Sequence, residues 1–158
     1  MIDNAQILAH VHQTMAYDFA RHSASHEGGN ETGWTLLGTR EGKTIVVRAI
    51  LPAGPNKQAS PTHIEFDHEF QRIMGMLYLL DDPQLKVVGI AHTHPNEDDY
   101  PSGDDFRADL AWLRMFPEKE ALFGIGTYTG SELSFGWYAL AIGHEVYRPV
   151  AMEIVRGY

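Results

Sequence analysis

The chain has 158 residues, 44% of them hydrophobic and 21% charged, which is the composition of a folded domain large enough to bury a core. It contains no cysteine, so disulfide bonds, thiolate metal sites and cysteine nucleophiles are excluded. Its 21 acidic and 12 basic residues give a formal charge of −9, which disfavours nucleic acid as a partner.

The first part of the chain shows the pattern of a helix followed by two strands. Residues 3–20 carry apolar side chains at helical spacing, and the polar, glycine-containing residues 22–30 are typical of a loop. Two apolar runs at residues 33–39 and 44–51 predict paired strands joined by a tight turn. A second loop is expected at residues 52–61. The apolar residues of the first helix are Ile7, Leu8, Val11, Met15 and Phe19.

The middle of the chain predicts a second helix and a buried strand. A short strand is expected at residues 63–66, followed by a helix that Asp67 can cap and that Asp82 and Pro83 end. Residues 87–91 form a continuous apolar run, the pattern of a strand covered on both faces. The apolar residues of the second helix are Phe70, Ile73, Met74, Leu77 and Leu80.

A third helix and three strands complete the prediction. These elements are a polar loop at 95–102, a helix at 103–116, and strands near residues 122–128, 132–140 and 145–155. The inner stripe of the helix is expected at Phe106, Leu110 and Leu113. Residues 129–131 are expected to turn the chain between the first two strands, and Pro149 indicates that the last strand is an edge or is bent.

Three helices and about six strands in mixed order predict an α+β fold (or an α/β-like one) with a mixed sheet, as a single domain over residues 1–158. No stretch approaches the roughly 20 apolar residues that span a membrane. The first six residues have neither the basic region nor the apolar block of a signal peptide, so the cytoplasm is the expected compartment.

Potential metal ligands gather around the end of the buried strand. His92 and His94 are two residues apart, so in an extended strand their side chains lie on the same face and can reach one ion. Asp105 opens the next helix, after a loop long enough to fold back over the strand end. Two imidazoles and one carboxylate leave a fourth position for water, which is the composition of a catalytic zinc site.

The same residues resemble a known family. An His-x-His pair alone is common by chance, but here it is followed by seven residues, Ser102, two residues and Asp105. This spacing is similar to the JAMM signature of the JAB/MPN (Mov34) metallopeptidases. The chain resembles a compact, prokaryotic-type member, and the resemblance implies an MPN/JAB-like curved sheet flanked by helices.

An upstream element extends the resemblance. The family places a glutamate at the start of an early strand and a glycine seven positions later, and Glu31 and Gly38 match this spacing. Trp34 departs from the pattern, because many members carry a small residue there. Glu27 is a second acid nearby, but it lies in the predicted loop and lacks the glycine spacing.

The resemblance implies a role for each of these residues. His92, His94 and Asp105 would bind Zn²⁺, whose bound water becomes more acidic. Glu31 would take the proton of the water and pass it to the leaving amine. Ser102 would donate to the oxyanion of the tetrahedral intermediate, and it is also suited to cap the next helix.

The resemblance also implies a class of substrate. Family members cleave peptide or isopeptide bonds at the C-terminal tail of ubiquitin, of a ubiquitin-like protein or of a small carrier protein. The acidic residues Glu97, Asp98 and Asp99 lie between the predicted ligands and could pair with a basic side chain of such a tail. The sequence predicts a protein partner and does not specify an oligomeric state.

Other readings of the motif remain open. One alternative is a non-catalytic MPN-type scaffold that binds metal without turnover, although such relatives generally lack the ligands. Non-haem iron oxygenases also use two histidines and a carboxylate, but their second histidine lies far downstream of the carboxylate. Cupins use an His-x-His pair within an all-β barrel, whereas a helix is predicted soon after the pair here.

Overall fold

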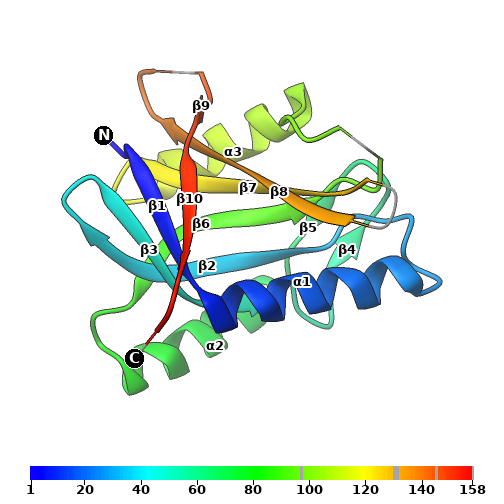
Figure 1. Cartoon of the computed structure of the whole chain (residues 1–158), viewed down its shortest axis with the longest axis horizontal. Helices are drawn as coiled ribbons and strands as arrows, with labels where there is room; N and C mark the ends of the chain where they lie inside the picture. The colour runs from blue at the N-terminus through cyan, green and yellow to red at the C-terminus, as the bar shows by residue number, and fades with distance from the viewer. Residues whose placement is uncertain (97, 130–131, 145, 158) are drawn as a thin grey trace.

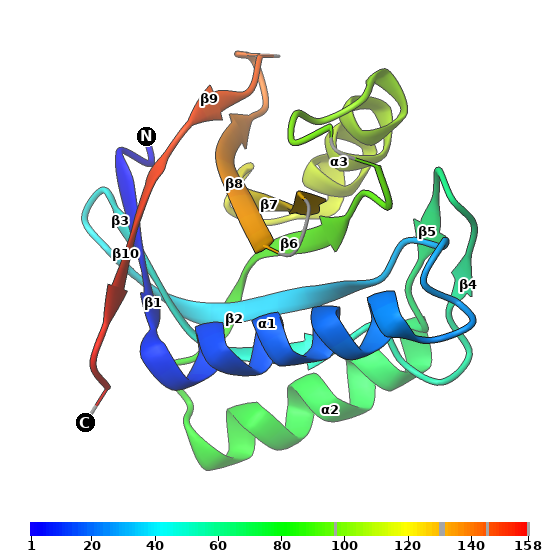
Figure 2. The same ribbon diagram turned by 45° about the vertical axis from the view of Figure 1, so that its right-hand side comes forward.

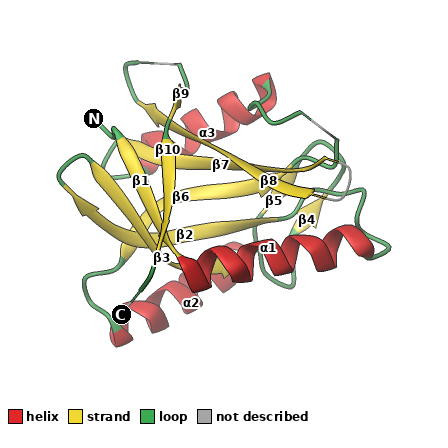
Figure 3. Cartoon of the chain, viewed as in Figure 1, coloured by secondary structure: helices red, strands yellow, loops and turns green. Residues whose placement is uncertain are grey.

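Three helices flank a large curved sheet in the computed structural model of the chain, which describes residues 1–96, 98–129, 132–144 and 146–157 (Figures 1 and 3). The helices are α1 (Ala9–Ala24), α2 (His68–Asp81) and α3 (Gly103–Met115). The strands are β1 (Asn4–Leu8), β2 (Gly33–Glu41), β3 (Thr44–Pro52), β4 (Gln58–Ala59), β5 (Ile64–Glu65), β6 (Lys86–Thr93), β7 (Glu120–Thr129), β8 (Glu132–Ala141), β9 (Arg148–Pro149) and β10 (Ala151–Val155). The predicted α+β class with a mixed sheet is confirmed.

The sheet curls until its two ends approach each other. Its strand order is β10-β1-β3-β2-β6-β7-β8-β9, and β4 and β5 form a separate small hairpin. Because β9 and β10 are consecutive in the chain, one short segment connects the two edges of the sheet (Figure 2). At the centre, β6 pairs antiparallel with β2 and parallel with β7, and α3 makes the crossover between these two parallel strands.

The helices cover both faces of the sheet. Val11, Met15 and Phe19 of α1 pack into the larger core together with Trp34 and Trp137. Helix α3 packs on the opposite face through a smaller, aromatic core. Helix α2 lies on this second face too, and the side chain of its Gln71 accepts a hydrogen bond from Thr35 of β2 at 2.7 Å. The members of the smaller core are Leu113, Ala121, Phe123, Ile125, Tyr138, Leu140 and Tyr147.

The beginning of the chain differs from the prediction. Residues 4–8 form β1, and the helix starts only at Ala9 and continues to Ala24, beyond the predicted start of the loop. Strand β1 pairs in parallel with β3 on one side and with β10 on the other, so distant residues decide its conformation. The residue before the helix is Leu8, which gives no side-chain cap, and the boundary therefore has no local signal.

The burial of α2 and α3 also differs from the expected pattern. Helix α2 forms where predicted and Asp67 caps it, but Ile73, Leu77 and Leu80 are 44%, 52% and 79% exposed. On α3, the buried positions are Asp105, Asp109 and Leu113, whereas Phe106 and Leu110 are only half-buried. Two aspartates, Asp105 and Asp109, thus occupy most of the buried stripe of α3 that was expected to be apolar.

Strand β6 is longer than the predicted segment and is not covered on both faces. Val87 and Ile90 are half-buried, because the face of β6 towards α3 borders an open groove. The predicted last strand is divided into β9 and β10, with Pro149 at the end of β9. Residues 130 and 131 of the predicted turn lie outside the described residues. In the part of the chain that is described, no helix has the length and apolar character to cross a membrane.

Candidate metal centre

The start of β2 lies beside the end of β6 and brings Glu31 close to the two histidines. Gly33 pairs with His92, and a Cβ at position 33 would lie only 2.6 Å from a carbonyl oxygen of β6. Just before β2, the carbonyl of Thr32 accepts the N–H of Thr93 at 2.8 Å, and the Thr93 hydroxyl accepts the N–H of Thr32 at 2.9 Å. These contacts fix the backbone that carries Glu31.

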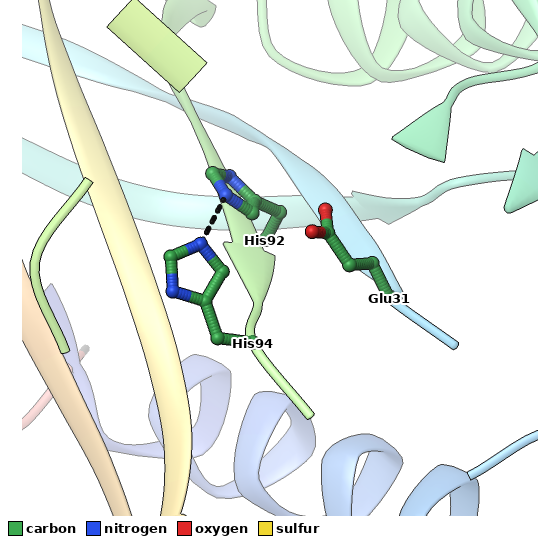
Figure 4. Close-up of side chains that lie close together, drawn as sticks. All are labelled: Glu31, His92 and His94. Carbon is green, nitrogen blue, oxygen red and sulfur yellow. Dashed lines mark hydrogen bonds between the residues drawn. The ribbon is translucent and has the colours of Figure 1, made fainter. Parts of the chain in front are cut away.

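His92 and His94 direct their Nε2 atoms towards each other at the end of β6 (Figure 4). The two atoms are 3.2 Å apart, and the residues are only 8% and 6% exposed. Nδ1 of His94 lies 2.7 Å from the carbonyl oxygen of Asp98. The neutral ring therefore keeps its proton on Nδ1 and offers the lone pair of Nε2 to a metal, the usual arrangement of a ligating histidine.

Asp105 joins this pair from the first turn of α3. The Ser102 hydroxyl accepts the N–H of Asp105 at 3.1 Å, and Oδ2 of Asp105 accepts the N–H of Ser102 at 2.8 Å. This capping box confirms that Ser102 is the N-cap of the helix. It also fixes the carboxylate with Oδ1 3.1 Å from Nε2 of His92 and Oδ2 3.0 Å from Nε2 of His94.

The spacing of these donor atoms fits one zinc ion. Ligand bonds of about 2.0–2.1 Å at tetrahedral angles place neighbouring ligand atoms about 3.3 Å apart. The two Nε2 atoms are separated by 3.2 Å, and each lies 3.0 or 3.1 Å from an oxygen of Asp105. Two imidazole nitrogens and a carboxylate oxygen are also donor types that zinc accepts.

Glu31 lies beside the donors without bonding to the histidines. One ligand atom each from Glu31, His92 and His94 lies within 4.8 Å of the others, so a Glu-His-His metal site is geometrically feasible too. Among the described residues, however, no hydrogen bond or ion pair joins Glu31 to either histidine, whereas Asp105 contacts both. Asp105 is thus the acid that contacts both imidazoles, and Glu31 lies near them without such a contact.

The candidate metal centre places a carboxylate close to two imidazoles. Burial alone would raise the pKa of Asp105, but hydrogen bonds from His92 and His94 outweigh it and hold the pKa well below its usual range. Burial alone would lower the pKa of His94, but its hydrogen bonds to Asp105 and to the Asp98 carbonyl leave the pKa raised. A metal binds the neutral imidazole, so protonation of His94 in acid weakens metal binding.

Glu31 is a carboxyl group that holds a proton unusually strongly. It is only 3% exposed, and burial raises its pKa to about 8; the charge of Asp105 adds to the rise, and His94 opposes it. A carboxyl group that exchanges its proton near neutral pH is suited to act as both general base and general acid. The neighbourhood of Glu31 therefore fits the role that the sequence predicts.

The buried position of Glu31 has a measurable cost in stability. Because its pKa is raised in the folded state, metal-free protein loses stability as the pH rises from 4.5, the ordinary value, through about 8. Glutamine removes this cost, so we expect Glu31→Gln to raise the Tm by roughly 3–8 °C at pH 8 and by much less at pH 5. Calorimetry in the presence of a chelator measures both differences.

Glu27→Gln is the matched control for this experiment, because it removes the same charge from an exposed side chain four residues earlier. Its Tm should equal that of the wild type at both pH values. If the stabilisation by Glu31→Gln does not grow between pH 5 and pH 8, the carboxyl group of Glu31 does not ionise in a buried setting.

A groove extends from the metal centre along the face of β6 that faces α3. Its volume is about 780 Å³, and it reaches from Glu31 and His92 at one end of β6 to Lys86 at the other. Apolar side chains of both elements, including Ile90 and Trp112, form much of its wall. The groove thus ends at His92 and Asp105, two of the candidate ligands.

Some features of the site were not found from the sequence. The groove depends on the distance between α3 and the β4–β5 hairpin, which no local pattern encodes. Asp109 lines the groove one helical turn after Asp105, and only its place on the buried side of α3 could have drawn attention to it. In the acidic loop, Asp98 and Asp99 are exposed and Glu97 lies outside the described residues.

Comparison with known proteins supports the same assignment of the fold. The chain is similar to a protein from Desulfitobacterium hafniense whose solution structure is known, with a TM-score of 0.67 and 16% identity, over 97% of this chain and 94% of that one. At this identity, the similarity is evidence for the fold alone. None of the curated proteins matches the chain.

A family model matches most of the sequence. The family is described as prokaryotic homologues of the JAB domain, and the match covers residues 13–154. This range includes both histidines of the metal centre, Glu31, Ser102 and Asp105. The chain therefore belongs to the prokaryotic homologues of the JAB domain.

Proposed function

We propose that the protein is a zinc-dependent hydrolase of JAMM type that cleaves peptide or isopeptide bonds. The observation that carries this proposal is the convergence of His92, His94 and Asp105 at the head of a groove, with the buried carboxyl group of Glu31 beside them. Three protein donors leave a position for water, as in catalytic zinc sites. A purely structural metal site would not require an open groove or a further buried acid beside the ligands.

The residues of the chain divide the reaction between them. Bound zinc would supply an acidified water and polarise the scissile carbonyl group. Glu31 accepts a proton from the attacking water on its carboxylate and then delivers it to the nitrogen of the leaving amine, so that the carboxylate is regenerated. Ser102 Oγ already accepts the N–H of Asp105, and this leaves its hydroxyl proton free to donate to the developing oxyanion.

The proposed substrate is the C-terminal tail of a ubiquitin-like or small carrier protein. The groove follows β6 from Lys86 to His92. An extended substrate chain is about 3.3 Å long per residue, so roughly six of its residues would fit along this groove. A flexible tail can enter such a groove, whereas a folded domain cannot. We expect this activity in the cytoplasm.

The direct test is cleavage of a panel of small ubiquitin-like and carrier proteins, each extended by a peptide after its C-terminal tail. Mass spectrometry should detect cleavage at the junction with the extension. A chelator should abolish it, and one equivalent of zinc should restore it. Protein that binds zinc at this site but cleaves no member of the panel would instead support the non-catalytic scaffold.

A further inference from the structure

A buried carboxyl group that forms no ion pair with a described residue lies in the wall of the groove. Asp109 is one turn after Asp105 on α3, is only 8% exposed, and lines the groove. With Asp105 and Leu113 it forms the buried stripe of the helix. An apolar side chain would be the stable choice at such a position, since burying an unpaired carboxylate is costly.

Asp109 has one polar partner in the described part of the chain. The hydroxyl of Tyr147 donates a hydrogen bond to Oδ2 at 2.6 Å, but no lysine, arginine or histidine among the described residues forms an ion pair with the carboxylate. Burial raises the pKa of Asp109 to about 7, with Tyr147 opposing the rise and Asp105 adding to it. At and above neutral pH, the carboxylate thus carries a charge that no ion pair within the described ranges neutralises.

The surroundings of Asp109 indicate what would neutralise it. Trp112 lines the groove three residues further along α3, and its ring stacks on Phe116 with centroids 4.7 Å apart. Ile90 faces the same space from β6. A side chain with an apolar stem and a cationic head matches this environment, because the stem can cover the aromatic surface while the head reaches the carboxylate.

We propose that Asp109 is a specificity-determining residue that selects an arginine or lysine side chain of the segment bound in the groove. This inference rests on the proposed function, because it takes that segment to be the substrate. Side chains one helical turn apart lie about 5–6 Å from each other, so the selected residue sits about two positions from the scissile bond in an extended chain. Asp109 would then recognise a basic side chain of the tail close to the site of cleavage.

The proposal can be tested by binding alone. The probes are fluorescent, alanine-based hexapeptides that carry one arginine at each position in turn, and a matched series with citrulline, which has nearly the same shape without the charge. Their Kd values are measured by anisotropy at pH 7.5 with the Glu31→Gln protein and one equivalent of zinc. In this background hydrolysis of the peptides is expected to be slower by roughly 100-fold or more, so that binding can be measured before cleavage.

At one position, near the end of the peptide that occupies the metal centre, the arginine peptide should bind at least about 10-fold more tightly than the citrulline peptide. A ratio of this size is expected for a charge-assisted hydrogen bond. Adding Asp109→Asn should reduce this ratio to about 1–2, because asparagine still accepts the hydrogen bond of Tyr147 but carries no charge. Asp81→Asn removes the same charge from the exposed end of α2, outside the groove, and should leave the ratio unchanged.

Three results would overturn the proposal. The first is an arginine-to-citrulline ratio that stays the same in Asp109→Asn at every position. The second is a ratio near 1 at every position in the protein with Asp109 intact. The third is an equal loss of affinity for both series in Asp109→Asn, which would indicate that Asp109 only anchors α3 through Tyr147. Because the assay needs no turnover, its outcome is independent of whether the wild-type protein hydrolyses any substrate.

Discussion

Replacing Glu31 with glutamine is expected to lower the rate of hydrolysis by roughly 100-fold or more, the usual scale of general acid–base catalysis, while the zinc stays bound. Glutamine keeps the shape of the side chain but cannot accept and return a proton. The donors of the metal centre are untouched, since Glu31 makes no hydrogen bond to His92 or His94 among the described residues. The measurements are kcat for tail cleavage and the zinc content of the same sample.

The alternatives give different results in this experiment. If Glu31→Gln loses its zinc together with its activity, Glu31 is a ligand, as the 4.8 Å cluster with the two histidines would allow. If Glu27→Gln is the inactive variant, the alignment of β2 with the motif is wrong. Glu27→Gln should behave like the wild type, because that side chain is exposed in the segment before β2.

Removing one donor of the metal centre is expected to abolish hydrolysis. His92→Ala leaves the buried carboxylate of Asp105 with a single imidazole, so zinc affinity should fall by more than the roughly 10–100-fold that changes outside the ligand shell cost. Activity should remain at background when zinc is added in excess. A cleavage assay over a range of zinc concentrations measures this.

His144→Ala is the matched control, because His144 is an exposed histidine that contributes nothing to the groove or the metal centre. It should cleave as the wild type does at every zinc concentration. Recovery of wild-type activity by His92→Ala at high zinc would mean that the histidine supports binding only weakly, and that the remaining donors suffice for catalysis.

The local part of the candidate site was predictable, because its residues follow one another at fixed intervals along simple elements. His92 and His94 end a strand and therefore share a face, and Ser102 and Asp105 form a capping box whose spacing is set by the first turn of a helix. Glu31 required more than local pattern, since it meets the histidines only through the pairing of β2 with β6. The family resemblance supplied that link.

Non-local contacts explain where the prediction was wrong. Residues 4–8 fit a helix by their own spacing, yet Ala5 and Ile7 are buried in a strand between β3 and β10, whose pairing no local window contains. The exposed apolar residues of α2 have the same spacing as a buried stripe, so the sequence alone cannot tell which helices are covered. Asp109 was overlooked because a carboxyl group in a helical stripe is normally taken as part of the solvent-facing side.

The proposed function requires that His92, His94 and Asp105 hold one zinc ion and that Glu31 does not. The most direct test is the zinc content, by elemental analysis, of purified wild type, Glu31→Gln, His92→Ala, His94→Ala and Asp105→Ala. We expect about one zinc per chain in the first two proteins, as in a mononuclear catalytic site, and far less in the other three. Equal zinc in His92→Ala and the wild type would contradict this assignment of the ligands.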